Sequence, residues 1–155
     1  METLKSYALL ATILLPFAAM VVIAFIPARR GLAVKITAAV FAFLTLLVSI
    51  FIFATYNYGQ GGFQFNREFG WLGTPLNISF KLGVDGISAP FVLLTGIVMF
   101  TGVLISWNVK HRPRDFFFLL MMLVTGVYGT FATLDLFFLF LFYELAVLPM
   151  YLLIG

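Results

Sequence analysis

One acidic residue, whose carboxyl group can gain or lose a proton, stands inside an apolar segment. Residues 136–155 read LFFLFLFYELAVLPMYLLIG, and Glu144 is the only charged residue among them. The eight residues from Leu136 to Glu144 span about 12 Å of helix, which puts the carboxyl group near the middle of a hydrocarbon core about 30 Å thick. Ionisable residues at that depth usually face a bundle interior or a water-filled path. The alternative is a protonated, hydrogen-bonded structural acid.

Pro149 follows Glu144 by five residues in the same segment. Proline removes one backbone donor from a helix and clashes with the carbonyl four positions earlier, here that of Leu145. A freed carbonyl beside the acid would support a polar site within the membrane. The other interpretation is an ordinary helix kink.

The composition places the whole chain in a membrane. Of its 155 residues, 63% are hydrophobic and only 10% are charged, whereas a soluble domain has about 25% charged residues. The chain has no cysteine, which excludes iron–sulfur ligation and disulfides within it. His111 is its single histidine, so no metal site of the usual kind is predicted. The basic residues lie in short loops, so nucleic acid is not the expected partner.

Five apolar segments predict an all-α polytopic membrane protein with a single membrane domain, residues 1–155. The spans are expected at about 4–26, 33–56, 87–107, 116–134 and 136–155. The first exceeds the usual length of a signal-peptide core and has no clear cleavage site, so we interpret it as an uncleaved helix. Asp85 or Ser88 is a candidate N-terminal cap of the third span, and Asp135 marks the turn into the fifth. The fourth span carries a face of small residues that we expect to pack against another helix.

Residues 57–83 differ from the rest and are expected outside the membrane. Residues 76–82, LNISFKL, alternate between apolar and polar side chains, which is the period of a half-buried strand, and residues 63–66 alternate more briefly. Turn-forming residues lie between these two stretches. The pattern predicts a small β-hairpin, with an irregular loop as the alternative. An apolar strand face needs a cover, so we expect the hairpin to contact a neighbouring subunit.

The distribution of basic residues predicts the orientation. The loops after the first and third spans contain six lysines and arginines, whereas the N-terminus and the loop after the second span contain three. The positive-inside rule therefore places the first and third loops in the cytoplasm and the N-terminus outside.

Two motifs resemble a known family. Residues 81–88, KLGVDGIS, and residues 142–145, FYEL, followed by LPM at 148–150, are similar to subunit M of bacterial NADH–quinone oxidoreductase, respiratory complex I, and to subunit 4 of mitochondrial NADH dehydrogenase. The resemblance implies an antiporter-like fold of about fourteen helices with two inverted repeats, of which this chain looks like the N-terminal portion. It also implies a multi-pass protein of the bacterial inner membrane.

The resemblance further implies a role for Glu144 in proton movement, as partner of a buried lysine on a later helix. The chain would be a subunit of a translocase, with other membrane subunits of a respiratory complex and the bilayer as its partners. It would carry out no redox chemistry and hold no cofactor itself, while FMN, iron–sulfur clusters and quinone are expected in partner subunits. Asp85, Asp135 and Pro149 are possible supporting residues.

Two other functions fit the same residues. The glutamate motif is shared by related subunits of Mrp-type cation/proton antiporters and membrane-bound hydrogenases, which would make the chain part of a system other than complex I. The third hypothesis is a structural membrane scaffold, against which Glu144 argues.

Overall fold

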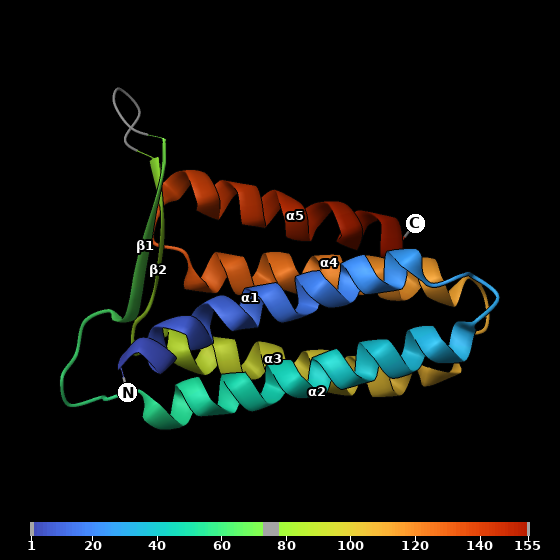
Figure 1. Ribbon diagram of the computed structural model, residues 1–155, viewed down its shortest axis with the longest axis horizontal. Helices are drawn as coiled ribbons and strands as arrows, with labels where there is room; N and C mark the ends of the chain where they lie inside the picture. Colours follow the sequence, from blue (N-terminus) through green and yellow to red (C-terminus); the bar gives the residue numbers. More distant parts are fainter. Residues whose placement is uncertain (1, 73–77, 155) are drawn as a thin grey trace.

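The computed structural model describes residues 2–72 and 78–154 as five long helices and a two-stranded sheet. The helices lie side by side along the long axis of the molecule, and the sheet stands across one of its ends (Figure 1). The helices are α1 (Glu2–Phe25), α2 (Gly31–Thr55), α3 (Ser88–Ile105), α4 (Pro113–Ala132) and α5 (Leu136–Ile154), with a short 3-10 helix, η1 (Ser106–Asn108), after α3. The strands are β1 (Gln64–Leu72) and β2 (Ile78–Val84).

All five helices are long and apolar enough to cross a membrane. The predicted class, a polytopic membrane protein with five spans and a small hairpin, is therefore confirmed. Helix ends differ from the expected positions by at most three residues, because hydropathy locates an apolar run better than it locates the first and last hydrogen bond of a helix.

Helix α4 occupies the centre of the bundle and α5 its edge. α4 packs against α1, α3 and α5, whereas α5 packs chiefly against α4. Accordingly, 44% of the α4 span is buried within the molecule, compared with 17% of the α5 span. Most of the α5 surface is therefore exposed on the outside of this bundle.

Two glycines of α4 let α5 approach closely. A methyl group on Gly126 would lie 2.6 Å from the backbone nitrogen of Ala146 and 2.7 Å from the backbone oxygen of Phe142, and one on Gly129 would overlap the Phe142 ring. The small-residue face predicted for the fourth span therefore does pack against another helix, and that helix is α5. Small residues allow this approach in membranes, where helices gain little from hydrophobic burial against each other.

A hydrogen bond between side chains connects α2 to α4 in the core. The hydroxyl oxygens of Ser49 and Tyr128 are 2.9 Å apart, and the Ser49 hydroxyl also lies 2.9 Å from the Thr45 carbonyl oxygen. Gly96 of α3 leaves room for the pair, because a methyl group there would lie 3.0 Å from the Tyr128 hydroxyl. The two buried hydroxyl groups thus satisfy each other, and α3 can close over them.

The hairpin pairs β1 with β2 in antiparallel register, with Glu68 opposite Lys81 and Phe69 opposite Phe80. This confirms the predicted hairpin, although β1 extends well beyond the stretch 63–66 whose alternation predicted it. The register shifts at two places along β1, and Phe65 adopts a positive φ of 61°. Such irregularities break the period-two pattern, so the sequence could not predict the full strand. The expected turn includes residues 73–77, which lie outside the described residues.

The hairpin is attached to the bundle through the turn between α4 and α5. The Leu134 N–H donates to the Lys81 carbonyl at 2.8 Å, and Leu82 forms an isolated bridge with Thr133. The Phe80 ring lies 4.7 Å from the Phe138 ring of α5, centroid to centroid. Thus α5 of the same chain covers part of the apolar strand face for which we expected a neighbouring subunit.

Candidate functional site

Glu144 lies on the side of α5 that faces away from α4. The buried residues Phe138, Phe142 and Pro149 define the inner side of the helix. Glu144 comes two residues after Phe142, a rotation of about 200° around the helix axis, and it is exposed. It has no hydrogen bond or ion pair with any other described residue of the chain.

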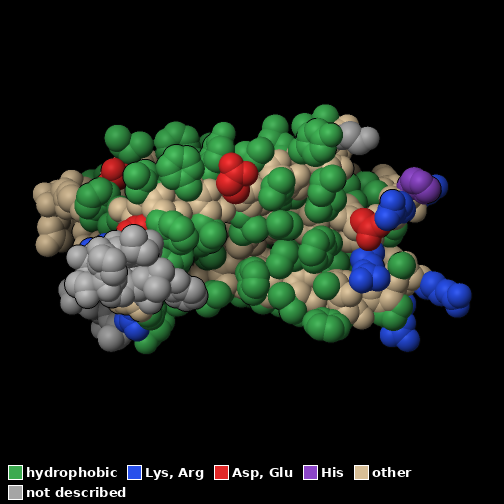
Figure 2. All heavy atoms as spheres, turned by 90° about the horizontal axis from the view of Figure 1, so that it is seen from above, with side chains coloured by type: hydrophobic (Ala, Val, Ile, Leu, Met, Phe, Trp, Pro, Cys, Tyr) green, Lys and Arg blue, Asp and Glu red, His purple; other side chains and the backbone are tan. Residues whose placement is uncertain are grey.

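The surroundings of Glu144 on this surface are apolar. The residues three and four positions away on either side share its face of the helix, and all four are exposed hydrophobics: Phe140, Leu141, Val147 and Leu148. In Figure 2, which looks onto the α5 side, hydrophobic side chains cover most of the surface between the two ends of the molecule. The carboxyl group therefore stands on an apolar surface of the molecule.

Glu144 lies near the middle of helix α5. It lies nine residues after Asp135 and ten before Ile154, which corresponds to about 13 Å and 15 Å of helix. The carboxyl group is therefore close to the middle of the α5 span.

The structure does not place Pro149 on the same face as Glu144. Pro149 lies within α5 and is buried, whereas Glu144 is exposed. The five-residue separation corresponds to a rotation of about 140° between the two side chains, and α5 continues through the proline to Ile154. Pro149 therefore packs within the bundle instead of lining the surface around the acid.

Asp135 and Asp85 lie at the hairpin end of the molecule, where they begin helices. Asp135 accepts hydrogen bonds from the Phe137 and Phe138 N–H groups at 2.9 and 3.4 Å. Asp85 accepts from the Ser88 N–H at 2.7 Å, and its own N–H donates to the Ser88 hydroxyl at 2.9 Å. Both are helix caps, about half a span from Glu144, and the structure gives them no contact with it.

The pKa of Asp85 lies below its ordinary value. The cause is the Ser88 N–H, which donates to the carboxylate, followed by the Ser88 hydroxyl, which donates at 2.8 Å. Hydrogen bonds to the charged form favour that form. Asp85 is thus held ionised as the cap of α3, which confirms the capping expected for Asp85 or Ser88.

Sequence reasoning did not identify Phe80, Thr133 and Leu134 as the residues that position α5. The contacts that these residues make across the hairpin and the turn fix the start of the helix, while Gly126 and Gly129 fix its distance from α4. Only the glycine spacing was visible in the sequence. The pairing of β2 with the turn joins residues 52 positions apart, and no local pattern signals such a contact.

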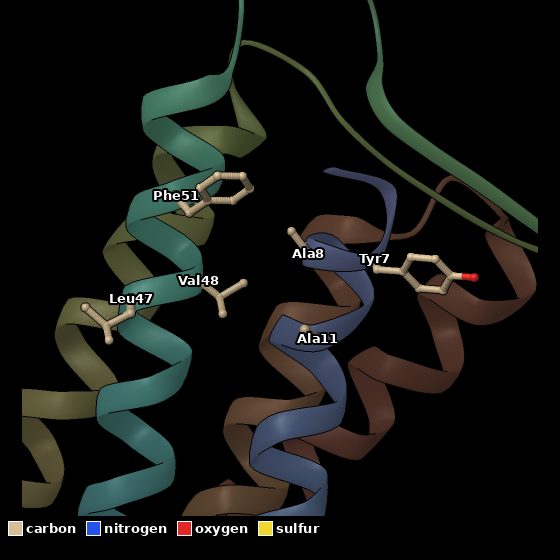
Figure 3. Close-up of a pocket in the computed structure, with 6 residues that line it drawn as sticks. All are labelled: Tyr7, Ala8, Ala11, Leu47, Val48 and Phe51. Carbon is tan, nitrogen blue, oxygen red and sulfur yellow. The ribbon is translucent and has the colours of Figure 1, made fainter. Parts of the chain in front are cut away.

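A groove between α1 and α2 offers no alternative chemical site. It is lined by Ala8 and Ala11 on one side and by Leu47, Val48 and Phe51 on the other, with Tyr7 at its edge. Figure 3 shows the Tyr7 ring directed away from α2, so its hydroxyl group does not reach the groove. Nor do the described residues contain a cluster of three side chains suited to hold a metal ion.

The fold and the position of Glu144 together define a multi-pass membrane protein with an acid in the middle of an apolar span. No protein-family model matches the chain. Curated relatives do: chain 4 of NAD(P)H-quinone oxidoreductase from Acaryochloris marina is 34% identical over 156 residues, covering 100% of this chain and 28% of the relative. The chloroplastic chain 4 of Chara vulgaris is 36% identical, covering 92% of this chain and 29% of the relative. Chain 4-2 of Synechocystis is 35% identical, covering 92% and 25%.

The resemblance to subunit M and subunit 4 is thereby confirmed: over nearly its whole length, this chain matches the family of NAD(P)H-quinone oxidoreductase chain 4. The chain spans about a quarter of the length of these relatives.

Proposed function

We propose that this chain is part of a proton-translocating membrane subunit of a NAD(P)H–quinone oxidoreductase, in which Glu144 takes up and releases a proton. The observation that carries the proposal is an acid at mid-span depth on an exposed, apolar helix face. The names of the curated relatives supply the enzyme class. Electron transfer would take place in partner subunits that carry FMN, iron–sulfur clusters and quinone.

Because Glu144 lies on the exposed face of α5, we expect its partner to come from a helix outside this bundle. Inserting a charged residue at the centre of a membrane helix costs about 2.5–3.5 kcal/mol on insertion scales. A basic side chain on a covering helix would offset that cost for the ionised acid, as the family resemblance implies for a lysine. The described residues place no basic side chain near the middle of the bundle, since their lysines and arginines lie at or near its two ends.

The protonation of Glu144 would then depend on the distance between its carboxyl group and the basic side chain of the covering helix. When the cation is close, the ionised carboxylate is favoured and its proton leaves. When the cation moves away, the neutral form is favoured and Glu144 takes up a proton. A conformational or electrostatic signal that separates and rejoins the pair would thus move protons without redox chemistry in this chain. The orientation that accompanies this proposal has the basic loops in the cytoplasm of a bacterium and the N-terminus outside.

Substitution of Glu144 tests this role. In the intact complex, Glu144→Gln should lower proton pumping and coupled quinone reduction about tenfold or more, because the amide cannot exchange a proton. Glu144→Asp should be milder, because it keeps an ionisable group one methylene shorter. Tyr143→Phe, which also removes a polar group from an exposed position of α5, is the matched control and should pump normally.

Proton pumping is measured in vesicles, and assembly is measured on native gels. Full pumping by an assembled Glu144→Gln complex would reject the proton-handling role. A structural acid predicts that pattern, with Gln nearly silent and Ala defective in assembly. Copurification of partners that contain flavin and iron–sulfur clusters tests the redox part separately, since an antiporter would lack them.

A further inference from the structure

Positive charge gathers at the end of the bundle opposite the hairpin (Figure 2). The residues that form this end, which we call the basic end, lie in the turns between α1 and α2 and between α3 and α4, or in the first turns of α2 and α4. They are Arg29, Arg30, Lys35, Lys110, Arg112 and Arg114. Asp115 is the one acidic residue in these segments. The proposed proton transfer at Glu144, in the middle of α5, does not use this end.

Two turns far apart in sequence meet to form the basic end. The Arg114 guanidinium donates from Nη2 to the Ala24 carbonyl at the end of α1, at 2.7 Å. A methyl group on Gly31 would lie 3.2 Å from Cγ of Pro113, so the first turns of α2 and α4 are in contact. The charges of both turns therefore share one surface.

Most of this charge is not neutralised within the chain. Arg112 pairs with Asp115 at 2.6 Å. Arg29, Arg30 and Lys110 are exposed and form no ion pair in the part of the chain that the structure describes. Helix stability does not account for Arg30, because positive charge at a helix N-terminus is unfavourable, and Arg30 occupies that position of α2 with no ion pair among the described residues.

Two features suit the basic end to the level of lipid headgroups. Trp107 of η1 is partly exposed just before Lys110, and tryptophan is enriched at the membrane–water interface. Beyond the cations, the surface becomes apolar at once: Leu32 of α2 is 64% exposed and Ile105 of α3 is 82% exposed. A ligand that fits both features has an anionic head and apolar tails.

We infer that the basic end binds the headgroup phosphate of an anionic phospholipid. The arginine guanidinium groups suit phosphate oxygens, to which they donate two parallel hydrogen bonds, and clusters of lysines and arginines beside membrane helices attract anionic headgroups. A soluble phosphate ion would meet the same charges, but it would leave the apolar surface at Leu32 and Ile105 unused. The positive-inside rule explains how many basic residues lie on this side, but it does not require the two turns to meet.

Photocrosslinking in nanodiscs tests the inference. The intact complex is placed in phosphatidylcholine nanodiscs that contain photoactivatable phosphatidylglycerol or, in parallel, photoactivatable phosphatidylcholine, and labelled peptides are mapped. Phosphatidylglycerol should label residues 26–31 and 106–114 well above phosphatidylcholine. Arg30→Gln should lower that labelling about fivefold, the factor expected for one basic residue near an anionic surface. Arg30→Lys should retain most of it.

Two controls separate the inference from other causes. Lys81→Gln removes one positive charge at the hairpin end and should leave labelling of the basic end unchanged. Arg30→Gln leaves five of the six basic residues in place. A single cysteine introduced into residues 57–63, in a chain that has none of its own, allows thiol labelling from one side of the membrane to verify the orientation. Equal labelling by the two lipids would overturn the inference, as would unchanged labelling in a correctly oriented Arg30→Gln protein. Complete competition by soluble glycerol phosphate would assign the site to free phosphate and would also overturn it.

Discussion

The two ends of the helix bundle begin their helices in opposite ways. At the hairpin end, Asp85 and Asp135 accept hydrogen bonds from the first N–H groups of α3 and α5. At the basic end, α2 and α4 follow Arg30 and Arg112, and neither arginine forms a capping hydrogen bond through its side chain. The first N–H groups of every helix need hydrogen-bond partners. Side chains supply such partners to α3 and α5 at the hairpin end, but not to α2 and α4 at the basic end.

The residues before the helices therefore serve different purposes at the two ends: at the hairpin end they stabilise the helix, and at the basic end they do not. An aspartate cap contributes about 1 kcal/mol and suits the positive end of the helix dipole. Arginine at the same position contributes the wrong charge, and the proposed contact with anionic lipid offers a reason for its presence there. Both ends are held by contacts within the chain, but only the basic end keeps several exposed charges without an ion pair among the described residues.

The largest expected effect comes from a substitution that displaces α5 while its Asp135 cap stays intact. In Gly126→Ala, the new methyl group would meet backbone atoms of Ala146 and Phe142, which cannot rotate away. We expect a loss of about 1–3 kcal/mol in the free energy of unfolding, the usual cost of overpacking, measured by denaturation in detergent micelles. Gly102→Ala is the control, since no atom lies within 4 Å of its new methyl group. Equal stability of the two variants would show that α5 does not depend on this contact.

The second prediction concerns pH and the hairpin end. Because the pKa of Asp85 is lowered in the folded protein, the stability that its charge contributes is present above the unfolded pKa of about 3.9. It is lost as the pH falls through the lowered pKa. We expect a contribution of at most about 1 kcal/mol, because solvent screens this partly exposed group.

The measurement is the thermal midpoint between pH 6 and pH 2, on the wild type and on Asp85→Asn. The wild type should lose more stability than the variant as the pH falls below about 4. Parallel curves for the two proteins would refute the capping role of the charge.

The smallest effect should be a gain of stability at the basic end. Arg30→Ser places a good capping side chain before α2 and removes an unfavourable charge, so the free energy of unfolding should rise by about 0.5–1 kcal/mol. Arg29→Ser removes the same charge one position earlier, outside the cap, and should give less. If Arg29→Ser stabilises as much as Arg30→Ser, charge alone and not capping explains the gain. In either variant, binding of anionic lipid should weaken while stability does not fall.

The sequence predicted the spans and the hairpin because each depends on a local pattern. Runs of about twenty apolar residues suffice to identify membrane helices, and LNISFKL alternates as a strand does. The cap at Asp85 or Ser88 was also predicted, because both residues stand at the start of an apolar run, whereas Asp135 was predicted only to mark the turn before α5. The irregular path of β1 at Phe65 was not, since a bulge interrupts the period that would reveal it.

The direction in which Glu144 points was beyond sequence reasoning for a different reason. Residues 136–155 are apolar on all sides, so periodicity cannot distinguish the face that packs from the face that is exposed. Tertiary contacts decide which face of α5 packs inward. The glycines of α4 leave room for Phe142, and Phe80 of the hairpin packs against Phe138. Once Phe138 and Phe142 face inward, Glu144 must face outward.

The hydrogen bond from Leu134 to Lys81 has a consequence for biosynthesis. The outer edge of strand β2 pairs with the turn between α4 and α5. About fifty residues, which include α3 and α4, separate the strand from that turn, so β2 emerges from the ribosome well before its partner. During that interval the strand presents unpaired backbone groups, which invite pairing with other chains. The hairpin can therefore reach its final form only after α4 has been inserted.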